Sequence, residues 1–248
     1  IHSEGLKANI HRPFRWQDFN LEDNSLPEYS EDEIKEYNKS DSPVLGFHLI
    51  DYEKHNEKSD KGIVENMKRN VEKLDSLFER RIVFELPPYD SYLIDTRKNS
   101  AKYFTSKEVV RELVENTSAG VLLDISHVFV GGMNKIKEGL FDGTIEDYFS
   151  EIMDVSKDKV WQLHVNVPRE NEKGYEDVHK TFENDELSER MIQIIKSVLE
   201  KSPNISVITL ELDTGLPPVE HARKTVEQAE ILNKRLNIKN KIEASPEH

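Results

Sequence analysis

The chain contains no cysteine, which excludes disulfide bonds and thiolate metal ligands. It has no apolar run near the length of a membrane span, and no secretory signal is visible at its start. Basic residues are fewer than acidic ones, 34 against 48, and the formal charge of −14 argues against a large phosphate-binding surface. We therefore expect a soluble cytoplasmic protein without membrane or DNA partners, in which any metal is held by His, Asp, Glu or water.

Six short apolar runs are present instead, and each ends at a residue that can bind a metal. The runs cover residues 6–10, 44–47, 81–84, 120–123, 160–163 and 207–210, and they lead into His11, His48, Glu85, Asp124, His164 and Glu211. Parallel strands of one polarity bring such end residues together at the carboxyl face of the sheet. A β/α barrel has its active site at this face.

The segments between these runs carry apolar residues at helical spacing. The first such pattern consists of Ile63, Met67, Val71, Leu74 and Phe78, and similar patterns cover residues 109–114, 148–155 and 187–198. Alternating strands and helices predict right-handed crossovers and a parallel sheet. We predict one α/β domain over residues 1–236, a TIM-type (β/α) barrel, followed by a polar tail over 237–248.

A complete barrel of this type has eight strands in about 250 residues, whereas six clear strands are present here. The sequence thus predicts a barrel without its first one or two βα units. Such a sheet exposes edges that favour association. We therefore expect that the natural chain extends N-terminally, or that a partner protein or self-association covers the gap.

Two long polar connections each follow a run that ends in a candidate ligand. Residues 21–41 are predicted to form a loop or lid with a short helix, and residues 165–183 are predicted to form a second polar connection. Both would lie over the active face.

The strongest local pattern joins Asp124 and His127. Asp124 would end a strand and His127 would lie in the turn beyond it, so both side chains can point into one cavity. Gly131 and Gly132 predict a tight turn after them. The alternative is that Asp124 caps the next helix and His127 is an ordinary loop histidine.

A second pattern is Asp177-Val178-His179. Side chains two residues apart in an extended segment lie on the same side, so Asp177 and His179 can bind one ion. The pair is more informative because it follows His164 at a predicted strand end.

The candidate ligands share one predicted face of the sheet. They are His11, His48, Glu85, Asp124, His127, His164, Asp177, His179 and Glu211. Nine ligands exceed the needs of one ion, so we expect two or three metal ions. Imidazole and carboxylate without thiolate suit iron, zinc or manganese.

These residues resemble the xylose-isomerase-like barrel superfamily, and within it the multinuclear non-heme iron-dependent oxidative enzymes. The resemblance covers roughly residues 6–232 and rests on segments 85–92, 120–130 with Asn134 behind, 160–164, 177–179 and 209–213 with Pro217 and Pro218. It implies an oxidoreductase that uses iron and dioxygen to modify a precursor peptide, or a small thiol or carboxylate, with the nine residues above as iron ligands. The chain departs from the family at Leu86, where an asparagine is expected, and at residues 165–168, where small residues with a further histidine are expected.

Three alternatives remain open. Residues 11–14, residues 123–129 with Gly132 behind, and the spacing of His164, Asp177 and His179 are similar to endonuclease IV, a zinc enzyme acting on abasic DNA. Glu176 and Glu183 near His179 oppose DNA binding. A metal-dependent sugar isomerase or epimerase would use Glu85 and Glu211 as acid and base. A non-catalytic barrel would keep the ligands for metal storage or peptide binding.

Overall fold

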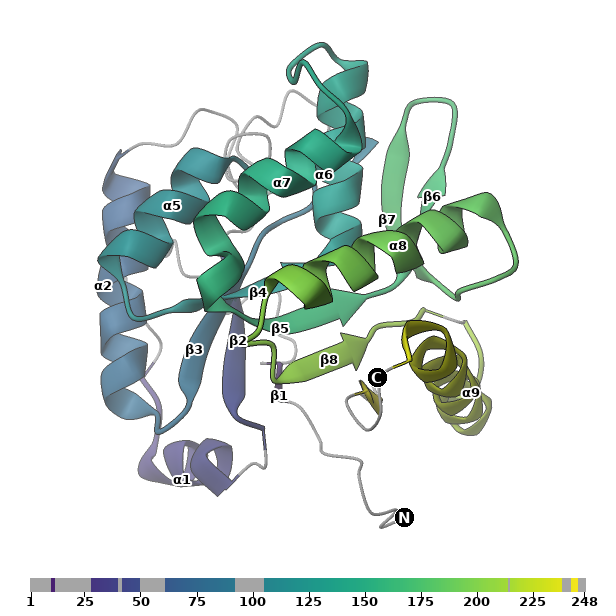
Figure 1. Cartoon of the computed structure of the whole chain (residues 1–248). Coiled ribbons are helices and arrows are strands. Elements are labelled where there is room, and N and C mark those ends of the chain that lie inside the picture. The colour runs from purple at the N-terminus through teal and green to yellow at the C-terminus, as the bar shows by residue number, and fades with distance from the viewer. Residues whose placement is uncertain are drawn as a thin grey trace.

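The computed structural model describes residues 10–11, 28–39, 42–49, 61–91, 105–213, 215–237 and 242–244, which fold around one parallel sheet (Figure 1). Its strand order is β1 (Ile10–His11), β2 (Val44–His48), β3 (Arg81–Glu85), β4 (Gly120–Asp124), β5 (Val160–Val165), β8 (Val207–Leu210) and β9 (Ile242–Ala244). Every neighbouring pair in this order is parallel. The six predicted strands are confirmed, although residues 6–9 of the first lie outside the described part.

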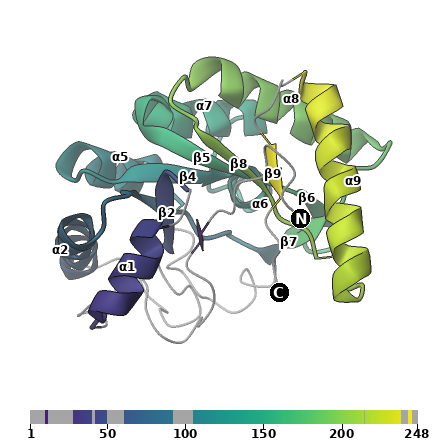
Figure 2. The same cartoon turned by 90° about the horizontal axis from the view of Figure 1, so that it is seen from below.

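The sheet is curled, and helices form an arc around its outside (Figure 2). Within the described residues its order runs from β1 to β9 with no pairing between these two strands. The structure thus confirms an α/β fold with a curled parallel sheet, whereas a closed barrel is not shown. The sequence did not predict β9, which pairs with β8 inside the segment expected to be a polar tail. Three residues are too few to show a periodicity.

The helices that cover the sheet follow from the apolar spacing. The predicted patterns form α2 (Lys61–Leu77), α5 (Lys107–Asn116), α7 (Ile145–Ser156) and α8 (Glu186–Lys201), and α1 (Glu31–Lys39) is the short helix expected within residues 21–41. A 3-10 turn, η1 (Lys157–Lys159), and α9 (Pro218–Leu236) complete this outer layer. Met67, Leu74, Leu113 and Ile195 are fully buried. None of the helices in the described part has the length and apolarity that a membrane span needs.

One helix contradicts the prediction of a tight turn after His127. Residues Ile125–Lys137 form α6, so Gly131 and Gly132 lie inside a helix. A Cβ atom at Gly132 would clash with the side chains of Ile145 and Tyr148 in α7. Gly132 is therefore needed for the close packing of two helices, and the turn interpretation is wrong.

The connection over residues 165–183 is also more ordered than predicted. It forms an antiparallel hairpin of β6 (Val167–Glu170) and β7 (Tyr175–Lys180), which packs against α6. The alternating apolar residues that normally reveal a strand are missing from β7. The hairpin is separate from the main sheet (Figure 1), and its strand β7 carries Asp177 and His179.

Candidate metal centre

Four side chains at the carboxyl ends of the strands form what we call the strand-end cluster. Its members are Glu85, Asp124, His164 and Glu211, each buried, and one ligand atom from each lies within 4.8 Å of the others. His164 Nδ1 is 2.9 Å from Glu211 Oε1 and 3.4 Å from Glu85 Oε1. Asp124 pairs with His164 in the register of β4 and β5. The parallel register alone therefore assembles most of this cluster.

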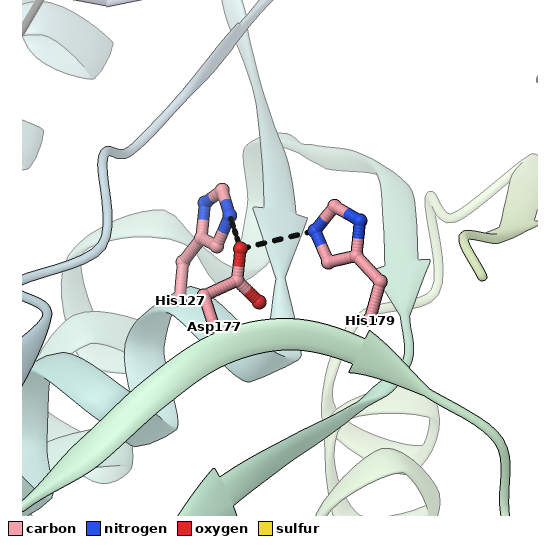
Figure 3. Close-up of side chains that lie close together, drawn as sticks. All are labelled: His127, Asp177 and His179. Atoms are coloured by element: carbon pink, nitrogen blue, oxygen red, sulfur yellow. Dashed lines mark hydrogen bonds and ion pairs between the residues drawn. The ribbon is translucent and has the colours of Figure 1, made fainter. Parts of the chain in front are cut away.

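Three further side chains form the hairpin cluster, which consists of His127 from the first turn of α6 and Asp177 and His179 from β7. Figure 3 shows the Asp177 carboxylate between the two imidazoles, and Asp177 Oδ2 is 3.0 Å from the Nε2 atom of each. The two clusters adjoin, because His127 Nδ1 lies 3.4 Å from Glu85 Oε1. Asp177 and His179 lie close together on β7, as the sequence predicted, and their role as ligands stays a prediction.

The remaining two predicted ligands lie at the margin. His48 Nε2 is 3.8 Å from Glu85 Oε2, and the His48 side chain is 35% exposed. The backbone of His11 forms β1 beside β2, but its side chain lies outside the described residues. The structure thus brings eight of the nine predicted residues to one end of the sheet.

Asp124 serves both interpretations that the sequence allowed. Its Oδ1 accepts a hydrogen bond of 2.8 Å from the backbone N–H of His127, so Asp124 is the N-cap of α6. Its Oδ2 is buried and has no hydrogen-bond partner within the described part of the chain. One carboxylate therefore fixes the helix that carries His127 and directs a second oxygen toward the strand-end cluster.

Hydrogen bonds outside the clusters orient two of the imidazoles. His127 Nδ1 lies 2.8 Å from the carbonyl oxygen of Leu86, to which it can donate, leaving Nε2 to face Asp177. His164 Nε2 lies 3.0 Å from the side-chain amide of Gln162, which also contacts Thr209 Oγ1 at 3.2 Å. The Nε2 atom of Gln162 donates to Thr209 Oγ1. The Nδ1 atom of His164 faces the carboxylates of Glu211 and Glu85.

Ionisation in the strand-end cluster reflects its burial. Burial raises the pKa of Asp124 to about 7, with the nearby acids adding to this and His127 opposing it. Burial also disfavours the charged form of Glu211, but His164 lowers the Glu211 pKa to about 2. The pKa of His164 is raised well above its usual value by Glu211 and Glu85, which outweigh burial.

Neighbouring charges also shift the pKa values of the hairpin cluster. Burial opposes protonation of His179, yet Asp177 raises its pKa to about 10. The pKa of His127 is raised well above its usual value by Asp124 and Asp177, against burial, and that of Asp177 is held well below its usual value. The raised pKa values of these histidines favour protonated imidazoles, whose positive charge compensates the neighbouring carboxylates. Divalent cations can replace these protons and leave the imidazoles neutral.

The donor set fits such cations. Asp124 Oδ2 and Asp177 Oδ1 are buried oxygens without a hydrogen-bond partner in the described part, and both belong to groups that could hold a metal ion. Carboxylate oxygens and imidazole nitrogens suit divalent first-row metals, and this set does not choose among iron, zinc and manganese.

The supporting roles of several residues were missed by the sequence interpretation, which named Asn134 only as part of the family resemblance. Asn134 in α6 is fully buried; its Nδ2 donates to the carbonyls of Tyr89 and Tyr175, and its Oδ1 accepts from the N–H of Tyr175. Asp90 Oδ2 accepts from the N–H of Asp177 at 2.8 Å. The spacing of Gln162 from His164 on one strand could have revealed Gln162. No sequence signal links Asn134 or Asp90 to the hairpin.

Fold and site together define a parallel α/β protein with two adjoining carboxylate and imidazole clusters at the carboxyl ends of its strands. A family model described as RiPP precursor modification enzyme MbnB/TglH/ChrH matches residues 58–234, which is more than half of the chain. The chain therefore belongs to this family of enzymes that modify precursor peptides, which confirms the resemblance to peptide-modifying enzymes and favours it over endonuclease IV. No curated protein matches the chain.

Proposed function

We propose that this protein is an oxidoreductase that modifies a residue of a ribosomally made precursor peptide, using dioxygen and two or three bound metal ions, with iron favoured. The observation that carries the proposal is the pair of adjoining clusters in a chain of this family. A small thiol or carboxylate remains the alternative substrate, and zinc and manganese the alternative metals.

Each cluster has a distinct task in this proposal. Glu85, Asp124, His164 and Glu211 would hold one ion, and His127, Asp177 and His179 would hold a second. A third ion would need His48 and His11 at the margin. Bound ferrous ions supply the one-electron chemistry with dioxygen that protein side chains lack.

The protein's own residues position these ions and limit access to them. His164 is fully buried, whereas the His179 and His48 side chains are 31% and 35% exposed. A peptide would therefore approach from the side of His48 and His179, while the strand-end cluster is kept from bulk water. The contact with Leu86 orients the His127 imidazole so that its Nε2 faces the hairpin cluster. The contact with Gln162 orients the His164 imidazole so that its Nδ1 faces the strand-end cluster.

The test begins with protein purified without chelator and analysed for metal content. We expect two or three iron ions per chain and dioxygen consumption that depends on an added precursor peptide, with a mass change in that peptide. Tightly bound zinc without iron, together with metal-dependent cleavage of abasic DNA, would contradict the proposal. The measurements should be repeated with His221→Ala, which changes a histidine on α9 outside both clusters.

A further inference from the structure

Asn166 has an amide group that the described part of the chain leaves without any hydrogen-bond partner. The residue is 0% exposed, and both its Oδ1 and its Nδ2 are buried and unpartnered there. Burying a carboxamide in this way is strongly unfavourable. A side chain of this kind indicates a partner that lies outside the described residues.

The position of Asn166 relates it to the strand-end cluster. Leu163, Val165 and Val167 belong to the main apolar core, and side chains alternate along a strand. Asn166 therefore lies on the opposite side, which it shares with His164.

The register of the sheet places Asn166 beside Glu211. Val165 pairs with Leu210 in β5 and β8, and the N–H of Glu211 donates to the carbonyl of Val165 at 3.2 Å. One residue further along both strands, Asn166 and Glu211 are neighbours on the cluster side.

The strand-end cluster indicates what kind of partner the Asn166 amide lacks. Asp124 Oδ2, in the strand-end cluster, is also buried without a hydrogen-bond partner in the described part. A cation satisfies a carboxylate oxygen and an amide oxygen alike, because both are good ligands for hard divalent ions.

We propose that Asn166 Oδ1 is a further ligand of the divalent ion held by the strand-end cluster. The inference rests on the proposed metal-binding function and deepens it by adding a neutral oxygen ligand that the His, Asp and Glu pattern could not reveal.

The test uses metal alone, with Fe²⁺ under anaerobic conditions and Co²⁺ as a spectroscopic probe. Asn166→Leu removes the ligand atom at similar size, and Asn166→Asp keeps an oxygen. Asn70→Leu, at a buried asparagine on α2, is the matched control. We expect Asn166→Leu to weaken binding at the strand-end cluster at least about tenfold in chelator competition, and to change the ligand-field absorption of Co²⁺. Asn166→Asp and Asn70→Leu should retain affinity.

The other possible outcomes would each overturn the assignment of Asn166 as a ligand. Unchanged affinity in Asn166→Leu, with raised thermal stability, would show that the amide is only an unsatisfied polar group. Weaker binding with an unchanged Co²⁺ spectrum would place Asn166 outside the coordination sphere and overturn the ligand assignment. If Asn166→Leu does not fold, the same criteria apply to Asn166→Ala. Failure of the wild-type protein to bind metal would overturn the proposed function as well, whereas wild-type binding that is unaffected in Asn166→Leu overturns this inference alone.

Discussion

The strand-end cluster and the hairpin cluster contain similar side chains but are held in place by different forces. Glu85, Asp124 and His164 end neighbouring parallel strands, so the hydrogen-bonded register of the whole sheet fixes them. Asp177 and His179 lie on a two-stranded hairpin outside that sheet. The comparison indicates that the first cluster is as stable as the fold, whereas the second depends on a few contacts.

Those contacts come from α6 and from the segment after β3. Asn134 makes three hydrogen bonds with Tyr89 and Tyr175, and Asp90 accepts from the N–H of Asp177. His179 has a left-handed backbone conformation, with φ of +47°, and its carbonyl oxygen accepts from the N–H of Asp213 at 2.9 Å. Such a conformation costs on the order of 1–3 kcal/mol in a residue other than glycine. One of the two ligands on β7 therefore has a strained backbone conformation.

The largest expected effects come from removing one histidine of each cluster. His164→Ala should lose the strand-end ion, and His127→Ala should lose the hairpin ion. Each should lower turnover by more than about 100-fold, because removing a metal ligand has a larger effect than removing a residue that supports the ligand. Metal analysis and peptide modification assays measure both effects. His221→Ala on α9 is the control. Full metal content in both ligand variants would refute the assignments.

Asn134→Ala should affect the hairpin cluster and leave the strand-end cluster intact. The substitution leaves buried backbone groups of Tyr89 and Tyr175 unpaired, at about 1–3 kcal/mol each, so we expect the free energy of unfolding to fall by a few kcal/mol. The hairpin ion should be lost while the strand-end ion is retained. Denaturant unfolding and metal analysis check this, with Asn116→Ala at the exposed end of α5 as the control. Retention of both ions at wild-type affinity would show that Asn134 does not position the hairpin.

Gly174→Ala should produce a weaker form of the same result. A Cβ atom at Gly174 would clash with Asn134 Oδ1, so the hairpin must shift away from α6. We expect about tenfold weaker binding of the hairpin ion, comparable to loss of a supporting contact. The matched control is Gly131→Ala, where the nearest atoms to a new Cβ lie 3.8 Å away. Equal metal affinities in the two variants would contradict the prediction.

The same difference explains what the sequence could and could not predict. Glu85, Asp124, His164 and Glu211 follow apolar runs, so the rule that parallel strands align their carboxyl ends was sufficient to group them. The contact of Asn134 with the hairpin joins segments about 40 residues apart through side-chain and backbone atoms, and no periodicity encodes such a contact. The helix α6 was considered only as an alternative, in which Asp124 caps the next helix, because two glycines normally disfavour a helix. Here the packing of Gly132 on α7 outweighs that preference.

The smallest expected effect is a pH dependence in protein freed of metal by a chelator. Asp177 raises the pKa of His179 to about 10, against an ordinary value of 6.5. A raised pKa contributes stability that is fully present below pH 6.5 and is lost as pH rises toward 10. Thermal unfolding across this range should therefore show a falling midpoint, with hydrogen exchange increasing in β7 before β4 and β5. His179→Gln should reduce the slope without removing it, because the pKa of His127 is raised as well. Metal-loaded protein should lack this contribution, since a ligating imidazole carries no proton to lose. An equal slope in His179→Gln and wild type would show that the hairpin does not depend on this ion pair.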